Sequence, residues 1–189
     1  MRLPEHPIAF TADGILPPGD HLLTTSSLPD SCLVLGGSSS ASWNGRWRAE
    51  LAARARHAIL ALWTAGAGDV VLDGSFVEDT PEPRDVDGYF ECDESLLADG
   101  TLEARLNQID PGGQWTWDAR RRRRGAGSSK AELPMWHARR LDFYPLPIHQ
   151  GTPDPAVKTI LDDLFRHRRG DGRTKGVVRL IRPAIRGPT

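Results

Sequence analysis

The sequence predicts an α/β or α+β fold built as a single domain. Its length of 189 residues is close to that of one domain. Hydrophobic residues make up 39% of the chain, which is enough for a core and excludes a wholly disordered protein. Segments with helical spacing of apolar residues alternate along the chain with short runs of strand type. This alternation is typical of a sheet packed against helices.

The first forty or so residues lack a sustained helical or strand period. They are rich in proline, glycine and serine, which favour turns and irregular structure. We therefore expect an irregular N-terminal arm over residues 1–43, the folded domain over residues 44–182 and a flexible tail over residues 183–189.

A helix is expected to begin near Trp47, because apolar residues recur there at spacings of three and four. These residues are Leu51, Ala55, Ala58, Ile59, Leu62 and Trp63. Arg48 falls among the polar positions of the same pattern. Gly66 and Gly68 end the helix. The apolar run 70–72 then predicts a short buried strand that stops at Gly74.

A loop and a second strand come next. Pro81 and Pro83 exclude residues 78–84 from a helix or a central strand. Residues 85–90 alternate polar and apolar, which predicts a strand with Asp85 and Asp87 on one face.

The remaining elements continue the alternation of helix and strand. They are expected as a helix at 94–109, a strand around Trp115 and Trp117, an exposed basic loop at 120–127, a strand at 139–144 ended by Pro145 and Pro147, a helix at about 155–167 and a strand at 177–181.

The composition excludes several classes of protein. No stretch approaches the roughly 20 apolar residues of a membrane span, so no membrane partner is expected. The N-terminus lacks an apolar signal-type region, and the only cysteines, Cys32 and Cys92, are far apart. These features argue against a disulfide framework and a structural zinc site and favour a cytoplasmic protein.

The formal net charge of −1 hides a strong segregation of charge. Residues 69–110 hold 13 acidic and two basic residues, whereas residues 118–142 hold eight basic and three acidic ones. The tail 163–189 adds eight basic and two acidic residues. Such blocks suit a cation site beside phosphate-binding sites, although solvated faces can also differ in sign by chance.

The acidic block contains a pattern that fits metal-dependent phosphate chemistry. Gly74 and Ser75, at the end of a strand, can present backbone N–H groups and a hydroxyl to a phosphate. Asp85 and Asp87 project the same way from the next strand, which suits a hard cation such as Mg²⁺. Phosphoryl and nucleotidyl transfer need such cations.

This pattern resembles the signature of the DNA polymerase β-like nucleotidyltransferase superfamily in its minimal form. More of the chain is similar to an uncharacterised bacterial group of nucleotidyltransferase-like proteins. The matching pieces are residues 16–21, 72–77 and 170–178. The resemblance implies a mixed sheet with helices packed on one side. It also implies that Gly74 and Ser75 hold nucleotide phosphates and that Asp85 and Asp87 bind metal.

A third carboxylate is expected from the resemblance on a later strand. Asp142, between Leu141 and Phe143, is the candidate, and it would bind a second ion and help to deprotonate the acceptor hydroxyl. Arg173 and Lys175 could neutralise the triphosphate or the pyrophosphate leaving group. They could equally be edge-strand charges that discourage aggregation.

A run of five arginines could contact nucleic acid, since it lies near Trp115, Trp117 and Lys130. It consists of Arg120, Arg121, Arg122, Arg123 and Arg124. The alternative is a solvated arginine loop.

The resemblance therefore implies an enzyme that uses Mg²⁺ or Mn²⁺ and an NTP such as ATP. It would move a nucleoside monophosphate to a hydroxyl of a protein, an RNA or a small molecule. Minimal nucleotidyltransferases often belong to toxin–antitoxin or defence systems. An inactive scaffold that binds a protein partner or RNA is the alternative.

Overall fold

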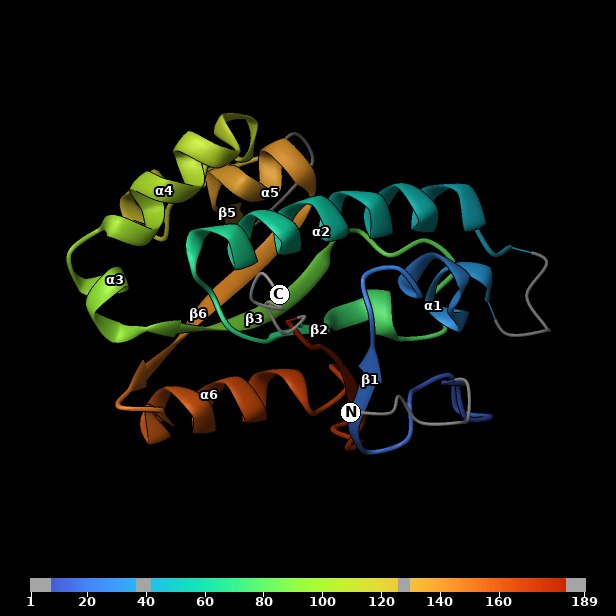
Figure 1. Cartoon of the computed structure of the whole chain (residues 1–189). Helices are drawn as coiled ribbons and strands as arrows, with labels where there is room; N and C mark the ends of the chain where they lie inside the picture. Colours follow the sequence, from blue (N-terminus) through green and yellow to red (C-terminus); the bar gives the residue numbers. More distant parts are fainter. Residues whose placement is uncertain (1–7, 37–41, 126–129, 183–189) are drawn as a thin grey trace, which may run out of the picture.

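The fold is α+β, with a mixed six-stranded sheet as its centre (Figure 1). The computed structural model describes residues 8–36, 42–125 and 130–182. The sheet has the order β1-β8-β2-β3-β6-β7. Its strands are β1 (Gly19–Leu23), β8 (Gly176–Leu180), β2 (Val70–Asp73), β3 (Val86–Asp93), β6 (Leu141–His149) and β7 (Thr152–Pro153). The pairs β1–β8 and β3–β6 are parallel, and the others are antiparallel.

Helices cover both faces of this sheet. They are α1 (Cys32–Leu35), α2 (Gly45–Ala65), α3 (Glu94–Ala98), α4 (Thr101–Ile109), α5 (Pro134–Arg139) and α6 (Pro155–Phe165). Short 3₁₀ turns occur at η1 (Leu28–Asp30), η2 (Gly74–Val77), η3 (Pro111–Gly113) and η4 (Ala119–Arg121), and β4 (Arg123–Arg124) pairs with β5 (Ala131–Glu132). Helices α2, α4 and α5 lie on one side of the sheet and α6 on the other (Figure 1).

The alternation of side chains along the strands explains these two layers. Val70 and Leu72 of β2 join the larger core under α2, whereas Val71 between them joins a smaller core with Leu161 and Phe165 of α6. The expected α+β class and mixed sheet are confirmed. The expectation that helices pack on one side describes α2, α4 and α5, and α6 adds a layer on the opposite face.

The predicted irregular arm at residues 1–43 is wrong in part. Strand β1 pairs in parallel with β8 along its whole length, and without it β8 would be an exposed edge. Leu16, Leu28 and Leu33 of the same segment are fully buried in the larger core. The predicted flexible tail, residues 183–189, lies outside the described residues.

Helix α2 confirms the predicted helix and corrects one residue in it. Asn44 caps its first turn, and Gly66 ends it in the left-handed conformation. Arg48, assigned to a polar position, is fully buried. Its guanidinium donates to the backbone carbonyls of Leu33, Thr80, Phe76 and Glu78, so it ties α2 to the segment around the Gly74 turn. Backbone acceptors therefore satisfy this buried cation.

Three later elements differ from the sequence pattern. The predicted helix 94–109 is broken at Gly100, which adopts a φ of +75° between α3 and α4. Trp115 lies in an irregular segment instead of a strand, because the Asn107 side chain bonds both its backbone N–H and its carbonyl. Strand β6 continues through Pro145 and Pro147. Its second edge pairs with β7 only from Ile148 onward, and at Pro147 the carbonyl accepts from Asp154 N at 2.9 Å, so this edge does not need the N–H groups that the two prolines lack.

Candidate functional site

Three aspartates lie side by side on three neighbouring strands. In the strand pairing, Asp87 of β3 is opposite Asp73 of β2 on one side and opposite Asp142 of β6 on the other. All three alternate with residues of the larger core, so they belong to the α6 side of the sheet. The sheet thereby brings together acids that are up to 69 positions apart in the sequence.

The Gly74 turn contacts this row directly. Gly74 has a φ of +72°, and a β-carbon at this position would lie 2.0 Å from Oδ2 of Asp87. Glycine is therefore required both by the backbone conformation and by the close approach of the Asp87 carboxylate. Phe76 and Val77, which follow in η2, are buried and anchor the turn in the core.

A cavity of about 250 Å³ opens beside Asp73, Asp85 and Asp87 near the C-terminal end of α6, whereas Asp142 is not among its lining residues. Asp73, Asp85 and Asp87 line it together with Gly74 and Ser75. Its other lining residues are Glu78, Arg84, Lys130, Glu132, Leu164, Phe165, His167, Arg169 and Lys175. The cavity thus combines carboxylates, cationic side chains and an apolar edge.

The carboxylates in and next to this cavity repel one another. Burial, together with the charges of Asp85, Asp142 and Asp73, raises the pKa of Asp87 to about 7. Burial also raises the pKa of Asp73 to about 6, although Lys175 opposes the shift. The pKa of Asp142 is likewise raised by burial. A bound cation would relieve this repulsion.

Hydrogen bonds from neighbouring side chains orient two of the predicted ligands. Asp85 Oδ2 accepts a bond of 2.6 Å from the indole Nε1 of Trp136. Asp142 Oδ2 accepts a bond of 2.8 Å from the Tyr144 hydroxyl and lies 3.5 Å from Lys130 Nζ. The other oxygen of Asp142, Oδ1, is buried without a hydrogen-bond partner among the described residues. A buried carboxylate oxygen of this kind is an open acceptor.

The structure separates the two basic residues that were expected to meet the phosphates. Lys175 is buried below the Gly74 turn, where its ammonium group lies 3.0 Å from Asp73 and 2.6 Å from Glu78. It also donates to the Gly74 carbonyl at 3.3 Å, so it supports the turn from below. Arg173 does not line the cavity and pairs with Asp13 at the surface, at 2.9 Å. Its expected role at the site is therefore not supported by its position.

Sequence reasoning did not assign three cations and one acid to this cavity: Arg84, Lys130, Arg169 and Glu132. Arg169 lines the cavity near Asp87, and it makes no ion pair within the part of the chain that the structure describes. Arg84 and Lys130 both approach the buried Glu132, at 3.6 and 3.2 Å. For Arg169, the only indication of a role in the sequence was the strongly basic tail that contains it. For Lys130 there was no periodic pattern, because it lies in a loop.

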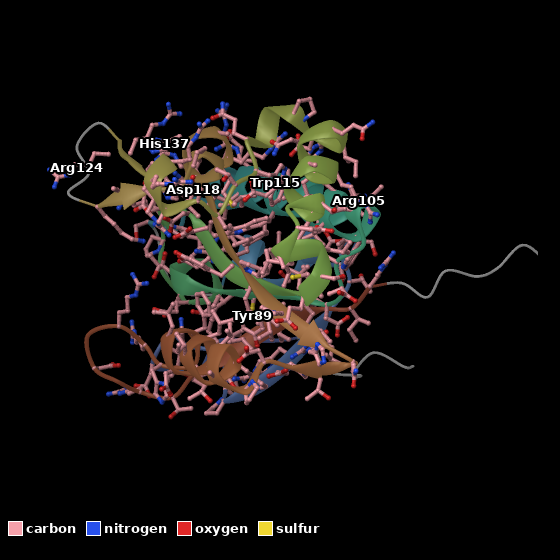
Figure 2. The ribbon with its side chains drawn as sticks, turned by 90° about the vertical axis from the view of Figure 1, so that its left-hand side faces the viewer. Tyr89, Arg105, Trp115, Asp118, Arg124 and His137 are labelled. Atoms are coloured by element: carbon pink, nitrogen blue, oxygen red, sulfur yellow. The ribbon has the colours of Figure 1, made fainter. Side chains whose placement is uncertain are left out.

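The arginine run lies largely outside this cavity. Arg120 pairs with Asp118 at 2.9 Å, and Arg122 approaches the Tyr144 hydroxyl at 3.5 Å. Arg121, Arg123 and Arg124 are exposed. Figure 2 shows Arg124 at the outer edge of the molecule, away from Trp115. A separate groove is lined by Arg120, Arg121, Arg122 and Arg123 together with Trp115 and Glu103.

The donors of the site fit a hard divalent cation, because carboxylate oxygens are the ligands that Mg²⁺ and Mn²⁺ prefer. The open Oδ1 of Asp142 and the raised pKa of Asp87 point the same way. Within residues 8–36, 42–125 and 130–182, however, no three His, Cys, Asp or Glu side chains are already arranged as a ligand set. The tryptophan, tyrosine and lysine contacts described above hold Asp85 and Asp142 in their present orientations.

The fold and the cavity together define an α+β protein with a carboxylate-rich site at one end of a mixed sheet. The chain belongs to a family described as a family of unknown function (DUF6932), which it matches over residues 8–181. No curated protein and no solved structure was found to match it. In the described part of the chain, no helix combines the length and apolar character needed to cross a membrane.

Proposed function

We propose that the protein is a metal-dependent nucleotidyltransferase that transfers a nucleoside monophosphate from an NTP to a hydroxyl group. The observation that carries the proposal is the register that sets Asp87 between Asp73 and Asp142, next to the Gly74 turn and with Asp85 in the same cavity. Asp85, Asp87 and Asp142 are the proposed metal ligands. A divalent cation bound there would supply charge neutralisation to the triphosphate.

Several groups of the cavity, together with Asp142 next to Asp87 in the sheet, have a part in this reaction. The N–H groups and hydroxyl of Gly74 and Ser75 bind phosphate oxygens, and Arg169 neutralises the charge of the leaving pyrophosphate. The acceptor oxygen attacks the α-phosphorus, the bond between that phosphorus and the β-phosphate oxygen breaks, and pyrophosphate leaves. Asp142, whose pKa is raised by burial, accepts the proton of the acceptor hydroxyl.

Lys175 has a different part from the one that its sequence position predicts. Its ammonium group is nine-tenths or more buried and already bonds Asp73, Glu78 and the Gly74 carbonyl. We therefore assign it to positioning the phosphate-binding turn. Arg169 takes the phosphate-neutralising role because it lines the cavity and has no competing ion pair with a described residue.

Transfer of label from α-³²P NTPs tests this function. Wild type would be incubated with Mg²⁺ or Mn²⁺, each of the four NTPs and pools of RNA, protein and small-molecule acceptors. We expect an acceptor to gain label with wild type and to lose that label with Asp87→Asn. Equal labelling by both proteins would exclude these carboxylates from the reaction.

A second candidate function rests on the exposed arginines. Arg121, Arg123 and Arg124 present positive charge outside the cavity, which suits a scaffold that binds RNA or an acidic protein partner without turnover. Binding of single-stranded RNA would then weaken steeply with salt and would survive Asp87→Asn. Loss of binding in a variant with all three arginines changed to glutamine would locate the contact.

A further inference from the structure

Lys130 forms a bridge between two buried carboxylates at the edge of the cavity. Its Nζ lies 3.2 Å from Oε2 of Glu132 and 3.5 Å from Oδ2 of Asp142. The two carboxylate side chains are 1% and 2% exposed, whereas the Lys130 side chain is 50% exposed. The cation therefore reaches the acids from solvent, at the end of a long flexible stem.

The chain contains a second bridging lysine with the opposite burial. Lys175 joins Asp73 and Glu78, but its side chain is only 2% exposed and it also bonds the Gly74 carbonyl. Removing it from its partners would leave charges buried on both sides. Of the two ammonium groups, only that of Lys130 is half exposed to water. Its withdrawal would leave Glu132 with Arg84, at 3.6 Å, and would leave Asp142 in need of another cation.

Lys130 also contacts Asp142, the proposed metal ligand that does not line the cavity. Asp142 lies beside Asp87 in the sheet, yet its Oδ2 is shared between Tyr144 and Lys130. A point charge at this position offsets the same negative charge that a second divalent cation would offset. The two cations therefore compete for one carboxylate.

We propose that Lys130 is a displaceable counter-ion that occupies the second cation position of the site. It holds Asp142 in a resting orientation, and a divalent cation releases its ammonium group to solvent. This inference rests on the proposed function, since it assigns Asp142 to a metal. The inference adds that Lys130 sets the affinity of the site for the second divalent cation.

The chain offers an internal test because it contains only three lysines, Lys130, Lys158 and Lys175. An amine-reactive acetylating reagent followed by mass spectrometry measures the reaction rate of each one in the wild-type protein. Adding Mn²⁺ alone should raise the rate at Lys130 severalfold. Lys158, at the surface of α6, should keep its rate, and Lys175 should stay protected. An unchanged or lower rate at Lys130 would overturn the proposal.

Calorimetric titration with Mn²⁺ gives a second, independent readout. Lys130→Gln should bind Mn²⁺ about tenfold more tightly than wild type, a size typical of changes next to metal ligands. Lys158→Gln, which removes a lysine of similar exposure, should bind as wild type does. Equal or weaker binding by Lys130→Gln contradicts the proposal.

The two experiments separate this inference from the proposed function. If Mn²⁺ binds to wild type and Asp87→Asn abolishes binding, while Lys130→Gln has no effect, only the counter-ion role fails. If Mn²⁺ binds to neither wild type nor Lys130→Gln, the metal site and the counter-ion role fail together.

Discussion

Gly74 and Asp87 lie so close that a single β-carbon at position 74 would overlap the Asp87 carboxylate, at 2.0 Å from its Oδ2. The contact joins the turn after β2 to the middle of the acidic row. Both the phosphate-binding and the metal-binding halves of the proposed site therefore depend on one glycine.

Substitution of this glycine should damage the site and the fold. We expect Gly74→Ala to lower the free energy of unfolding by about 2–4 kcal/mol, from the clash together with the left-handed φ. Urea denaturation measures the change. Gly172→Ala is the matched control, because Gly172 has a φ of +69° and no atom lies within 4 Å of the place that its β-carbon would take. It should cost about 1 kcal/mol. Equal losses would show that the Asp87 contact is unimportant.

The raised pKa of Asp87 predicts a stability that depends on pH. The folded protein holds the proton up to about pH 7, whereas the unfolded chain releases it near 3.8, so stability falls as pH rises between these values. Asp85, Asp142 and Asp73 raise this pKa and Arg169 opposes them. Asp87→Asn should therefore raise the Tm at pH 8 and change it less at pH 5.

The size of this effect can be bounded. A gain of roughly 4–8 °C at pH 8 would correspond to about 2 kcal/mol for a chain of this length. Asp163→Asn, on the exposed side of α6, serves as the control and should leave the Tm unchanged at both pH values. A Tm of Asp87→Asn that is equal to or below that of wild type at pH 8 would refute the predicted repulsion.

Lys175 should be far more important for stability than an exposed lysine. Lys175→Met leaves Asp73 and Glu78 without their buried cation, which should cost about 3–5 kcal/mol in urea denaturation. Lys158→Met removes only the surface pair with Asp162 and should cost less than about 1 kcal/mol. Similar costs for the two variants would contradict the supporting role of Lys175 beneath the turn.

Arg169 and Arg173 provide a matched pair for the phosphate site. Both are exposed arginines of the basic tail, but only Arg169 lines the cavity. We expect Arg169→Gln to weaken the binding of an NTP with Mn²⁺ by about tenfold, the loss of one charge-assisted contact. Arg173→Gln should bind as wild type does. Calorimetry measures NTP binding by both variants. Weaker binding by Arg173→Gln than by Arg169→Gln would assign the phosphate-neutralising role to Arg173 instead.

Local patterns in the sequence predicted much of the fold but not its pairing. The 3.6-residue period predicted α2, alternation placed Asp87 on one face of a strand, and the family resemblance singled out Asp142 on a later strand. The order of strands depends on contacts between distant segments, so no local pattern indicates that β6 lies beside β3. The positions of the three aspartates are therefore structural findings, while their chemical roles stay predictions.

Residues with non-periodic roles escaped prediction for a physical reason. Arg48 looks like a solvent-facing helix residue, and only the folded loop supplies the carbonyl groups that make its burial stable. Lys130 and Arg169 reach the cavity from segments next to β5 and after α6. Their contribution depends on how the folded chain brings these segments back to the cavity, and composition alone does not predict this.

The binding of Mn²⁺ and NTP to the purified protein, measured by calorimetry, tests the central claim most directly. We predict that wild type binds Mn²⁺, that an NTP binds only when Mn²⁺ is present, and that Asp85→Asn/Asp87→Asn loses both. Negligible heats with wild type, or heats that the double substitution leaves unchanged, would contradict the claim that these carboxylates form a nucleotidyltransferase metal site.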